Sequence, residues 1–126
     1  MNPTNNTAPG DKAPEHPVFD ANVLGALFDH EPALITSVLQ TFVVGTRSNL
    51  AELAQALAAK DLAAVAALAH KTAGASRMSG AIALGHCAHS VEQAAKQGNV
   101  AAVQQGFADL ESQWRLVQTA IAAQPT

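Results

Sequence analysis

The sequence predicts an all-α protein, an antiparallel up-down four-helix bundle with a short extra N-terminal helix. Alanine accounts for 28 of the 126 residues, whereas β-branched and aromatic residues are few, and this composition favours helix over strand. Four long stretches carry apolar residues at helical spacing. Short turn-rich segments join these stretches, and such short connections place adjacent helices antiparallel.

The composition excludes several classes of protein. Hydrophobic residues make up 48% of the chain, too many for a wholly disordered protein, yet no apolar run of about 18 residues is present to span a membrane. A single cysteine excludes a disulfide framework. The net charge of −3, with only seven Lys and Arg, argues against a nucleic-acid partner. The first residues lack the basic and apolar regions of a signal peptide, so we expect a cytoplasmic location.

The first 17 residues differ in character from the rest of the chain. Residues 1–17 are rich in Pro, Asn and Thr and have no hydrophobic periodicity, which predicts a disordered tail or an interdomain linker. The helical domain is expected to occupy residues 18–126. Such a start suits a free-standing protein as well as a module at the end of a larger one, and the sequence leaves both open.

The first two helices follow from a cap and a turn. Asp20 is a good N-cap for a short helix that reaches Phe28. Residues 29–32 have the composition of a turn, with Pro32 in the first turn of a long helix over residues 31–59. The apolar positions of this long helix lie close to helical spacing, and they are Leu34, Ile35, Val38, Leu39, Phe42, Val43, Leu50, Leu53 and Leu57.

Capping residues also delimit the third and fourth helices. Asp61 is the predicted N-cap of a helix that continues to about Ser79, and Gly80 is a suitable stop. The fourth helix is expected over residues 81–97. The residues expected on the inner faces of these two helices are Leu62, Val65, Leu68, Ala69, Leu84, Cys87, Ala88, Val91 and Ala95.

The last helix has the most regular pattern of the chain. Gly98 ends the preceding helix, and Asn99 is a good N-cap for this one. Its apolar residues are spaced 4, 3, 4, 3 and 4 positions apart, which is typical of the seam of an antiparallel bundle. These residues are Val103, Phe107, Leu110, Trp114, Val117 and Ile121.

Three residues of the third helix form a stripe that points to a chemical role. His70, Gly74 and Arg77 are four and three positions apart, so they share one helix face. Glycine inside a helix costs about 1 kcal/mol relative to alanine, and here it leaves bare backbone between an imidazole and a cation. Ala66 and Ala67, one turn earlier, are also small. A second protein could therefore approach the imidazole closely.

The functional interpretation of this stripe is a nucleophilic histidine that carries a phosphoryl group. Neutral imidazole is available near pH 7, and one ring nitrogen must be unprotonated to attack. Arg77 could then meet the anion attached to His70. The alternative is that His70 is an ordinary helix residue and that Gly74 serves only close helix packing. The stripe by itself leaves both open.

A wider pattern surrounds the stripe. Ala69-His70 is followed four positions later by Gly74, and further segments of the same pattern are Val18-Phe19-Asp20, residues 29–34, Gly80-Ala81, Leu84, Cys87, Val91-Glu92 and Gln97-Gly98-Asn99. Over residues 18–122 the chain resembles the histidine-containing phosphotransfer (HPt) domain of bacterial multistep phosphorelays, and most of all the C-terminal HPt modules of hybrid sensor histidine kinases. It departs from the family at Thr72, where an apolar residue is usual, and at Ala73, where Lys is frequent. Together with the Pro-rich start, Ala73 favours a domain fused to a sensor histidine kinase, at the cytoplasmic end of a membrane-anchored protein, over a free-standing protein.

The resemblance implies a phosphorelay intermediate without turnover of its own. His70 would accept a phosphoryl group from a phospho-aspartate of one receiver domain and pass it to an aspartate of another. The receiver would also supply the Mg²⁺ that balances charge, so no cofactor or metal is expected on this domain. In place of the Lys that is missing at Ala73, Lys71 and Arg77 are the local candidates for balancing the phosphoryl charge.

The resemblance also implies supporting residues. Glu92 matches a family position whose side chain lies beside the histidine, where a carboxylate could accept a hydrogen bond from one imidazole N–H and fix the tautomer. The alternative for Glu92 is a solvated helix charge. Receiver docking is expected on an apolar patch around His70, and Phe42 either borders this patch or belongs to the core. The candidate lining is Ala66, Ala67, Ala73, Gly74 and Arg77.

Other functions compete with the carrier role. A phosphate-independent docking or regulatory four-helix module fits the departures at Thr72 and Ala73. An enzyme is disfavoured, because the sequence has no paired carboxylates at helical spacing and no Gly-rich phosphate loop. A metal site at His86, Cys87 and His89 is disfavoured as well, because a sequential His-Cys pair cannot face one way on a helix.

Overall fold

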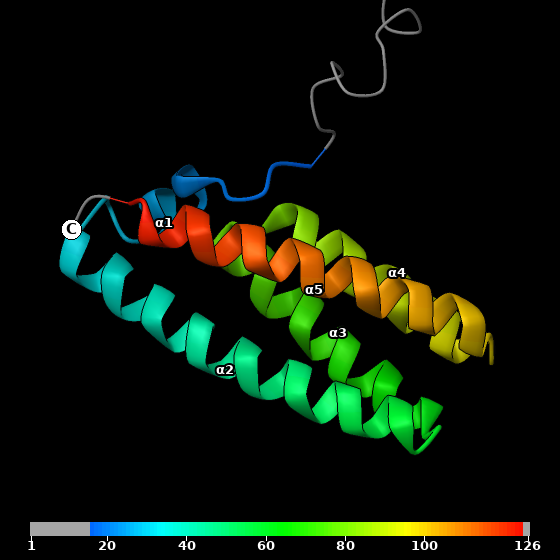
Figure 1. Ribbon diagram of the computed structural model, residues 1–126. Coiled ribbons are helices and arrows are strands. Elements are labelled where there is room, and N and C mark those ends of the chain that lie inside the picture. Colours follow the sequence, from blue (N-terminus) through cyan, green and yellow to red (C-terminus); the bar gives the residue numbers. More distant parts are fainter. Residues whose placement is uncertain (1–15, 125–126) are drawn as a thin grey trace, which may run out of the picture.

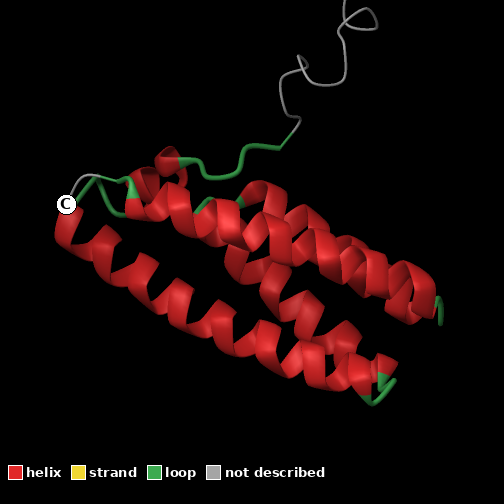
Figure 2. Cartoon of the chain, viewed as in Figure 1, coloured by secondary structure: helices red, strands yellow, loops and turns green. Residues whose placement is uncertain are grey.

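The computed structural model describes residues 16–124, and the regular elements in that range are all helices (Figure 1, Figure 2). In chain order the helices are α1 (Ala21–Leu27), α2 (Pro32–Ala58), α3 (Leu62–Ser79), α4 (Ile82–Lys96) and α5 (Val100–Ala122). Adjacent long helices run antiparallel, and α1 lies near one end of the bundle (Figure 1). The predicted all-α bundle with a short extra helix is therefore confirmed.

Side-chain caps start three of the helices where the sequence predicts them. The side chains of Asp20, Asp61 and Asn99 each accept a hydrogen bond from a backbone N–H in the first turn of the following helix, at 3.0 to 3.1 Å. These bonds satisfy N–H groups that have no partner inside the helix. The predicted helix boundaries agree closely with the observed ones because they depend on these local caps.

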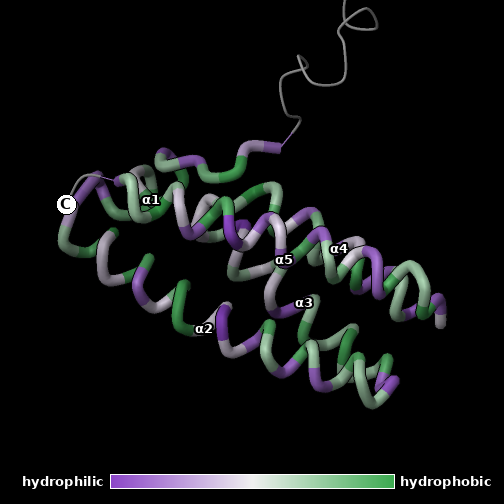
Figure 3. The backbone as a smooth tube through the Cα atoms, viewed as in Figure 1, coloured by the Kyte–Doolittle hydropathy of each residue, from purple (hydrophilic) through white to green (hydrophobic). Residues whose placement is uncertain are grey.

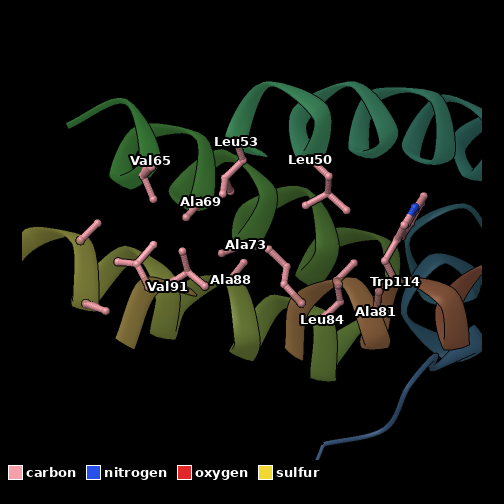
Figure 4. Packing of buried hydrophobic residues seen from close by; sticks show 14 of the residues in the cluster. Leu50, Leu53, Val65, Ala69, Ala73, Ala81, Leu84, Ala88, Val91 and Trp114 are labelled. Atoms are coloured by element: carbon pink, nitrogen blue, oxygen red, sulfur yellow. The ribbon is translucent and has the colours of Figure 1, made fainter. Parts of the chain in front are cut away.

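The core lies between the four long helices (Figure 4). Hydrophobic and hydrophilic residues are interspersed along the helices (Figure 3). Trp114 of α5 packs edge to face against Phe42 of α2, with ring centroids 5.9 Å apart. The largest fully buried apolar side chains are Leu53, Leu84, Leu110, Val65, Val91, Val103 and Val117.

Helices α3 and α4 approach each other closely because the residues between them are small. Ala69, Ala73 and Ala88 are buried in this part of the core (Figure 4). A Cβ atom added at Gly85 of α4 would lie 3.3 Å from the carbonyl oxygen of Ala73 and 2.9 Å from Cγ of Arg77. Small residues therefore permit this approach, and it brings α4 side chains within reach of those on α3.

A glycine at the end of α3 fixes the position of α1. Gly80 caps α3 in the left-handed conformation, with φ of 94°. Its carbonyl accepts a hydrogen bond of 2.8 Å from the backbone N–H of Asp20, the residue that caps α1. A side chain at position 80 would collide with the carbonyl oxygen of Asp20. The short helix is thus held against the turn between α3 and α4.

The first half of α2 borders an apolar groove. This groove has a volume of about 730 Å³ and is lined by α1, the first half of α2 and the C-terminal end of α5. Leu34, in the same part of α2, is 51% exposed although it falls at an apolar position of the predicted helix. At least one apolar side chain in the first turns of α2 is therefore not covered by the other helices. None of the groove-lining residues belongs to the stripe of His70, Gly74 and Arg77.

Two residues of the predicted N-terminal tail contact α4. The carbonyl of Pro17 accepts a hydrogen bond of 2.9 Å from the N–H of Ala83, and the ring of His16 stacks on that of His86 with centroids 4.2 Å apart. The remainder of the predicted tail, residues 1–15, lies outside the described residues. Within residues 16–124, the helices are too short or too polar to cross a membrane.

We expect Gly80→Ala to destabilise the protein more than Gly98→Ala does. Both glycines have positive φ, 94° and 73°, but an added Cβ meets the Asp20 backbone at position 80 and nothing within 4 Å at position 98. Strain alone predicts a loss of about 1 kcal/mol at position 98, and the collision should raise the loss at position 80 to about 2 to 3 kcal/mol. Urea unfolding measures both, and equal losses would contradict the role of the Asp20 contact.

Candidate functional site

His70 stands on the exposed side of α3 with one ring nitrogen turned towards α4. Its side chain is 75% exposed, and its Nδ1 lies 3.1 Å from Oε2 and 3.3 Å from Oε1 of Glu92. The expected contact between these two residues is present. An ionised carboxylate only accepts hydrogen bonds, so Nδ1 must carry the proton that it donates. This tautomer leaves the lone pair on Nε2 of an accessible imidazole.

Glu92 is a buried carboxylate surrounded by basic groups. Only 5% of the residue is exposed, and Lys96 Nζ contacts its Oε2 at 2.9 Å while His89 Nδ1 lies 3.7 Å from its Oε1. The hydrogen bond from Lys96 is the largest cause that lowers the pKa of Glu92 below its ordinary value. Burial acts in the opposite direction, and the hydrogen bond from His70 lowers the pKa further. Glu92 is therefore ionised at neutral pH.

Sequence reasoning missed Lys96 and His89 as parts of this site. Both lie on the same face of α4 as Glu92, at the i+4 and i−3 positions. That spacing was the available signal. It identifies partners of Glu92, but only the packing of α4 against α3 connects them to His70.

The rest of the predicted stripe lies on the surface. Gly74 is exposed, and a Cβ atom added there would meet nothing within 4 Å. Arg77 is exposed as well, and its aliphatic stem lies over Gly85 of α4. Lys71 is exposed beside His70 in the sequence, and within residues 16–124 neither Lys71 nor Arg77 forms an ion pair. Two cations without a carboxylate partner among these residues thus belong to the helix that carries the histidine.

Comparison with known proteins assigns the family. The model of the Hpt domain family matches residues 37–123, which include both His70 and Glu92. The chain belongs to the Hpt domain family. Hpt domains have a phosphotransfer role in phosphorelays. A search of curated proteins finds no match.

A solved structure agrees with this family. The crystal structure of histidine-containing phosphotransfer protein B (HptB) from Pseudomonas aeruginosa PAO1 superposes with a TM-score of 0.79. The two sequences are 26% identical, and the match covers 84% of this chain and 92% of that one. The similarity therefore extends over most of the helical bundle.

One residue of the predicted docking patch of this Hpt domain is buried instead. Ala73 is 2% exposed and lies in the core among residues of α2 and α4 (Figure 4), so the expectation that it lines the surface is wrong. Phe42, for which the sequence left the core and the patch border both open, packs on Trp114 in the core. Gly74 and Ala67 are exposed and Ala66 is half-buried. Ala73 is buried because the rotation of α3 about its axis turns position 73 towards the core.

Thr72, a departure from the Hpt pattern, is accommodated inside the bundle. It is fully buried, and its hydroxyl donates a hydrogen bond of 2.8 Å to the carbonyl of Leu68 in the preceding turn. A buried hydroxyl with a partner costs little, and the methyl group of Thr72 occupies a core position. Threonine at this position is therefore compatible with burial in the core.

The residues considered for a metal site have separate partners. His86 stacks on His16, whereas His89 turns towards Glu92. Cys87 is half-buried, and this burial, together with the charge of Asp109, raises the pKa of its thiol. A protonated thiol is a poor ligand, because metals bind the thiolate. These three side chains do not converge on one point.

We expect the pH dependence of folding stability to change in Glu92→Gln. The pKa of Glu92 is lower in the folded protein than in the unfolded chain, so the ionised carboxylate stabilises the fold above its unfolded pKa of about 4.3. This contribution is lost as the pH falls through the lower folded value. The wild type should therefore lose more stability than Glu92→Gln between about pH 5 and pH 3 in urea unfolding.

The control for this experiment is Glu111→Gln, which removes an exposed carboxylate from α5. Its unfolding free energy should follow that of the wild type across the same pH range. Parallel profiles for the wild type and Glu92→Gln would contradict the stabilising role of the buried carboxylate.

Proposed function

We propose that this Hpt domain carries a phosphoryl group on Nε2 of His70, taken from a phospho-aspartate of one receiver domain and delivered to an aspartate of another. The observation that carries the proposal is the pairing of an exposed imidazole with a buried carboxylate, 3.1 Å from Nδ1 to Oε2 of Glu92. Exposure makes the nucleophile accessible to a protein partner. The carboxylate selects the ring nitrogen that attacks.

The bonds formed and broken in the proposed transfer balance. The lone pair on Nε2 attacks the phosphorus of the receiver's acyl phosphate, the new N–P bond forms, and the aspartate leaves as a carboxylate as its P–O bond breaks. The imidazole becomes positively charged while Nδ1 keeps its proton. The Glu92 carboxylate, within hydrogen-bond distance of that N–H, stabilises the charge that develops on the ring. Transfer to a second receiver runs through the same steps in reverse.

Receiver docking is proposed on the surface of α3 around His70. Gly74 leaves bare backbone one turn after the histidine, which allows the receiver to approach. Lys71 and Arg77 supply positive charge to the phosphoryl group, which carries negative charge throughout the transfer. The Mg²⁺ ion is proposed to come with the receiver. We expect a modest, transient interface, low in charge at its centre.

The test of the carrier role is phosphotransfer with a His70→Gln control. The protein is incubated with Mg²⁺ and a receiver domain that is phosphorylated on its aspartate. We expect label on the wild type that is labile in acid and stable in base, as a phosphoramidate is, and no label on His70→Gln. Because the His70 side chain is exposed, the variant should keep its unfolding free energy to within about 1 kcal/mol.

Absence of label with a panel of receivers would overturn the proposal. It would leave the alternative function, a docking or regulatory module that works without phosphate. Label on His70→Gln would place the accepting residue elsewhere in the chain.

Gly74→Leu should slow phosphotransfer while leaving the fold intact. The new side chain projects into open space, and glycine is a poor helix former, so stability should stay equal or rise by up to about 1 kcal/mol. The docking receiver would meet the added bulk, and the rate should fall by at least about tenfold if the interface packs tightly there. Ala108→Leu, at an exposed position of α5, is the matched control. An unchanged rate in Gly74→Leu would refute docking over this glycine.

A further inference from the structure

Two donors share one oxygen of the buried carboxylate. Oε2 of Glu92 lies 3.1 Å from Nδ1 of His70 and 2.9 Å from Nζ of Lys96. Oε1 lies 3.3 Å from the same Nδ1 and 3.7 Å from Nδ1 of His89. Lys96 thus contacts the group that holds the nucleophile, although it lies 26 positions away from His70 in the sequence.

We propose that Lys96 is a positioning residue for His70, which acts by holding Glu92 ionised and in place. This inference rests on the proposed function, because it concerns the same histidine. Lys96 is the last residue of α4, and its ammonium group reaches back one turn to the carboxylate. The carboxylate is thereby fixed with both oxygens directed at Nδ1 of His70.

The need for a cation follows from the burial of the carboxylate. Taking Glu92 out of water penalises its charged form, and this effect opposes the hydrogen bonds that lower its pKa. Among residues 16–124, the basic groups that face the carboxylate are His70 from α3 and His89 and Lys96 from α4. Lys96 is the aliphatic ammonium group among them, and its hydrogen bond is the largest cause that lowers the pKa of Glu92.

Loss of the charge on Glu92 would exchange the roles of the two ring nitrogens. A protonated carboxyl can donate its O–H to Nδ1 of His70. Nδ1 must then be the unprotonated nitrogen of the ring, because it accepts this bond with its lone pair. The ring proton would move to Nε2, the nitrogen that is proposed to attack. Such a histidine has no lone pair at the exposed position and cannot form the N–P bond there.

The position of Lys96 at the end of α4 also suits a structural role. Its side chain is 58% exposed. A cation at the end of a helix also interacts favourably with the helix dipole. Stability alone therefore cannot distinguish a positioning role from a structural one.

The test compares Lys96→Met, which removes the charge, with Lys96→Arg, which keeps it. Lys60→Met, in the turn between α2 and α3, is the control with the same change in net charge. Two quantities are measured in each protein: the rate of phosphorylation by a phospho-receiver from pH 6 to pH 8, and the His70 tautomer from ¹⁵N chemical shifts of the imidazole in the unphosphorylated protein.

We expect Lys96→Met to lower the rate about three- to tenfold near pH 7, because an ion pair that is partly exposed is partly screened by water. The deficit relative to the wild type should grow as the pH falls, since Glu92 without Lys96 gains its proton at a higher pH. The Nδ1–H tautomer of His70 should lose population in the same variant. Lys96→Arg and Lys60→Met should resemble the wild type in both measurements.

The two measurements together decide the proposal. A slower rate with an unchanged tautomer would overturn it, since Lys96 would then act on docking or on the phosphoryl group. An unchanged rate would overturn it as well. If the wild type accepts no phosphoryl group from any receiver, the proposed function fails, and the tautomer measurement by itself still decides whether Lys96 positions His70.

Discussion

The close approach of α3 and α4 is the constraint on which the site depends. Alanine at positions 69, 73 and 88 and glycine at position 85 leave too little side-chain volume to keep the two backbones apart. A larger residue at position 85 would press on the carbonyl of Ala73 and on the stem of Arg77. The same approach places Glu92 of α4 within hydrogen-bond distance of His70 on α3. Packing of small residues in the core thus sets the geometry of polar residues at the surface.

The two partners of the hydrogen bond between His70 and Glu92 differ in their exposure to solvent. His70 is exposed, as the proposed attack on a group held by another protein requires. Glu92 is more effective when buried, because a hydrogen bond to a charged group is stronger where water does not compete. Burial of the carboxylate calls for compensating positive charge nearby. The ammonium group of Lys96, a partly exposed side chain of α4, lies 2.9 Å from Oε2 of Glu92. One carboxylate therefore connects the core with the surface that carries His70.

The departures from the Hpt pattern are explained by burial. Thr72 and Ala73 both face the core, where Thr72 satisfies its hydroxyl within α3 and Ala73 fills a narrow space beside α4. Neither residue touches the proposed docking surface. Their differences from the usual family residues therefore concern packing, and they do not by themselves argue for a domain that has lost phosphate chemistry. The apolar groove beside α1 is likewise lined by other residues than the site.

The sequence by itself determined the helices and the central histidine of this protein. Caps such as Asp61 and the pattern of apolar residues act within a few positions of the chain, so the helices could be identified without the fold. The spacing of His70 and Gly74 could be identified in the same way, because both residues lie on one helix. The pairing of Glu92 with His70 needed the family resemblance as well. Only the tertiary structure decided the burial of Ala73 and the place of Lys96 beside the carboxylate that contacts His70. Helix α3 consists largely of small residues, which carry little contrast between a buried and an exposed face, so its rotation was set by contact with α4. Lys96 meets His70 only through a carboxylate on a second helix, and that contact exists only once the two helices are packed.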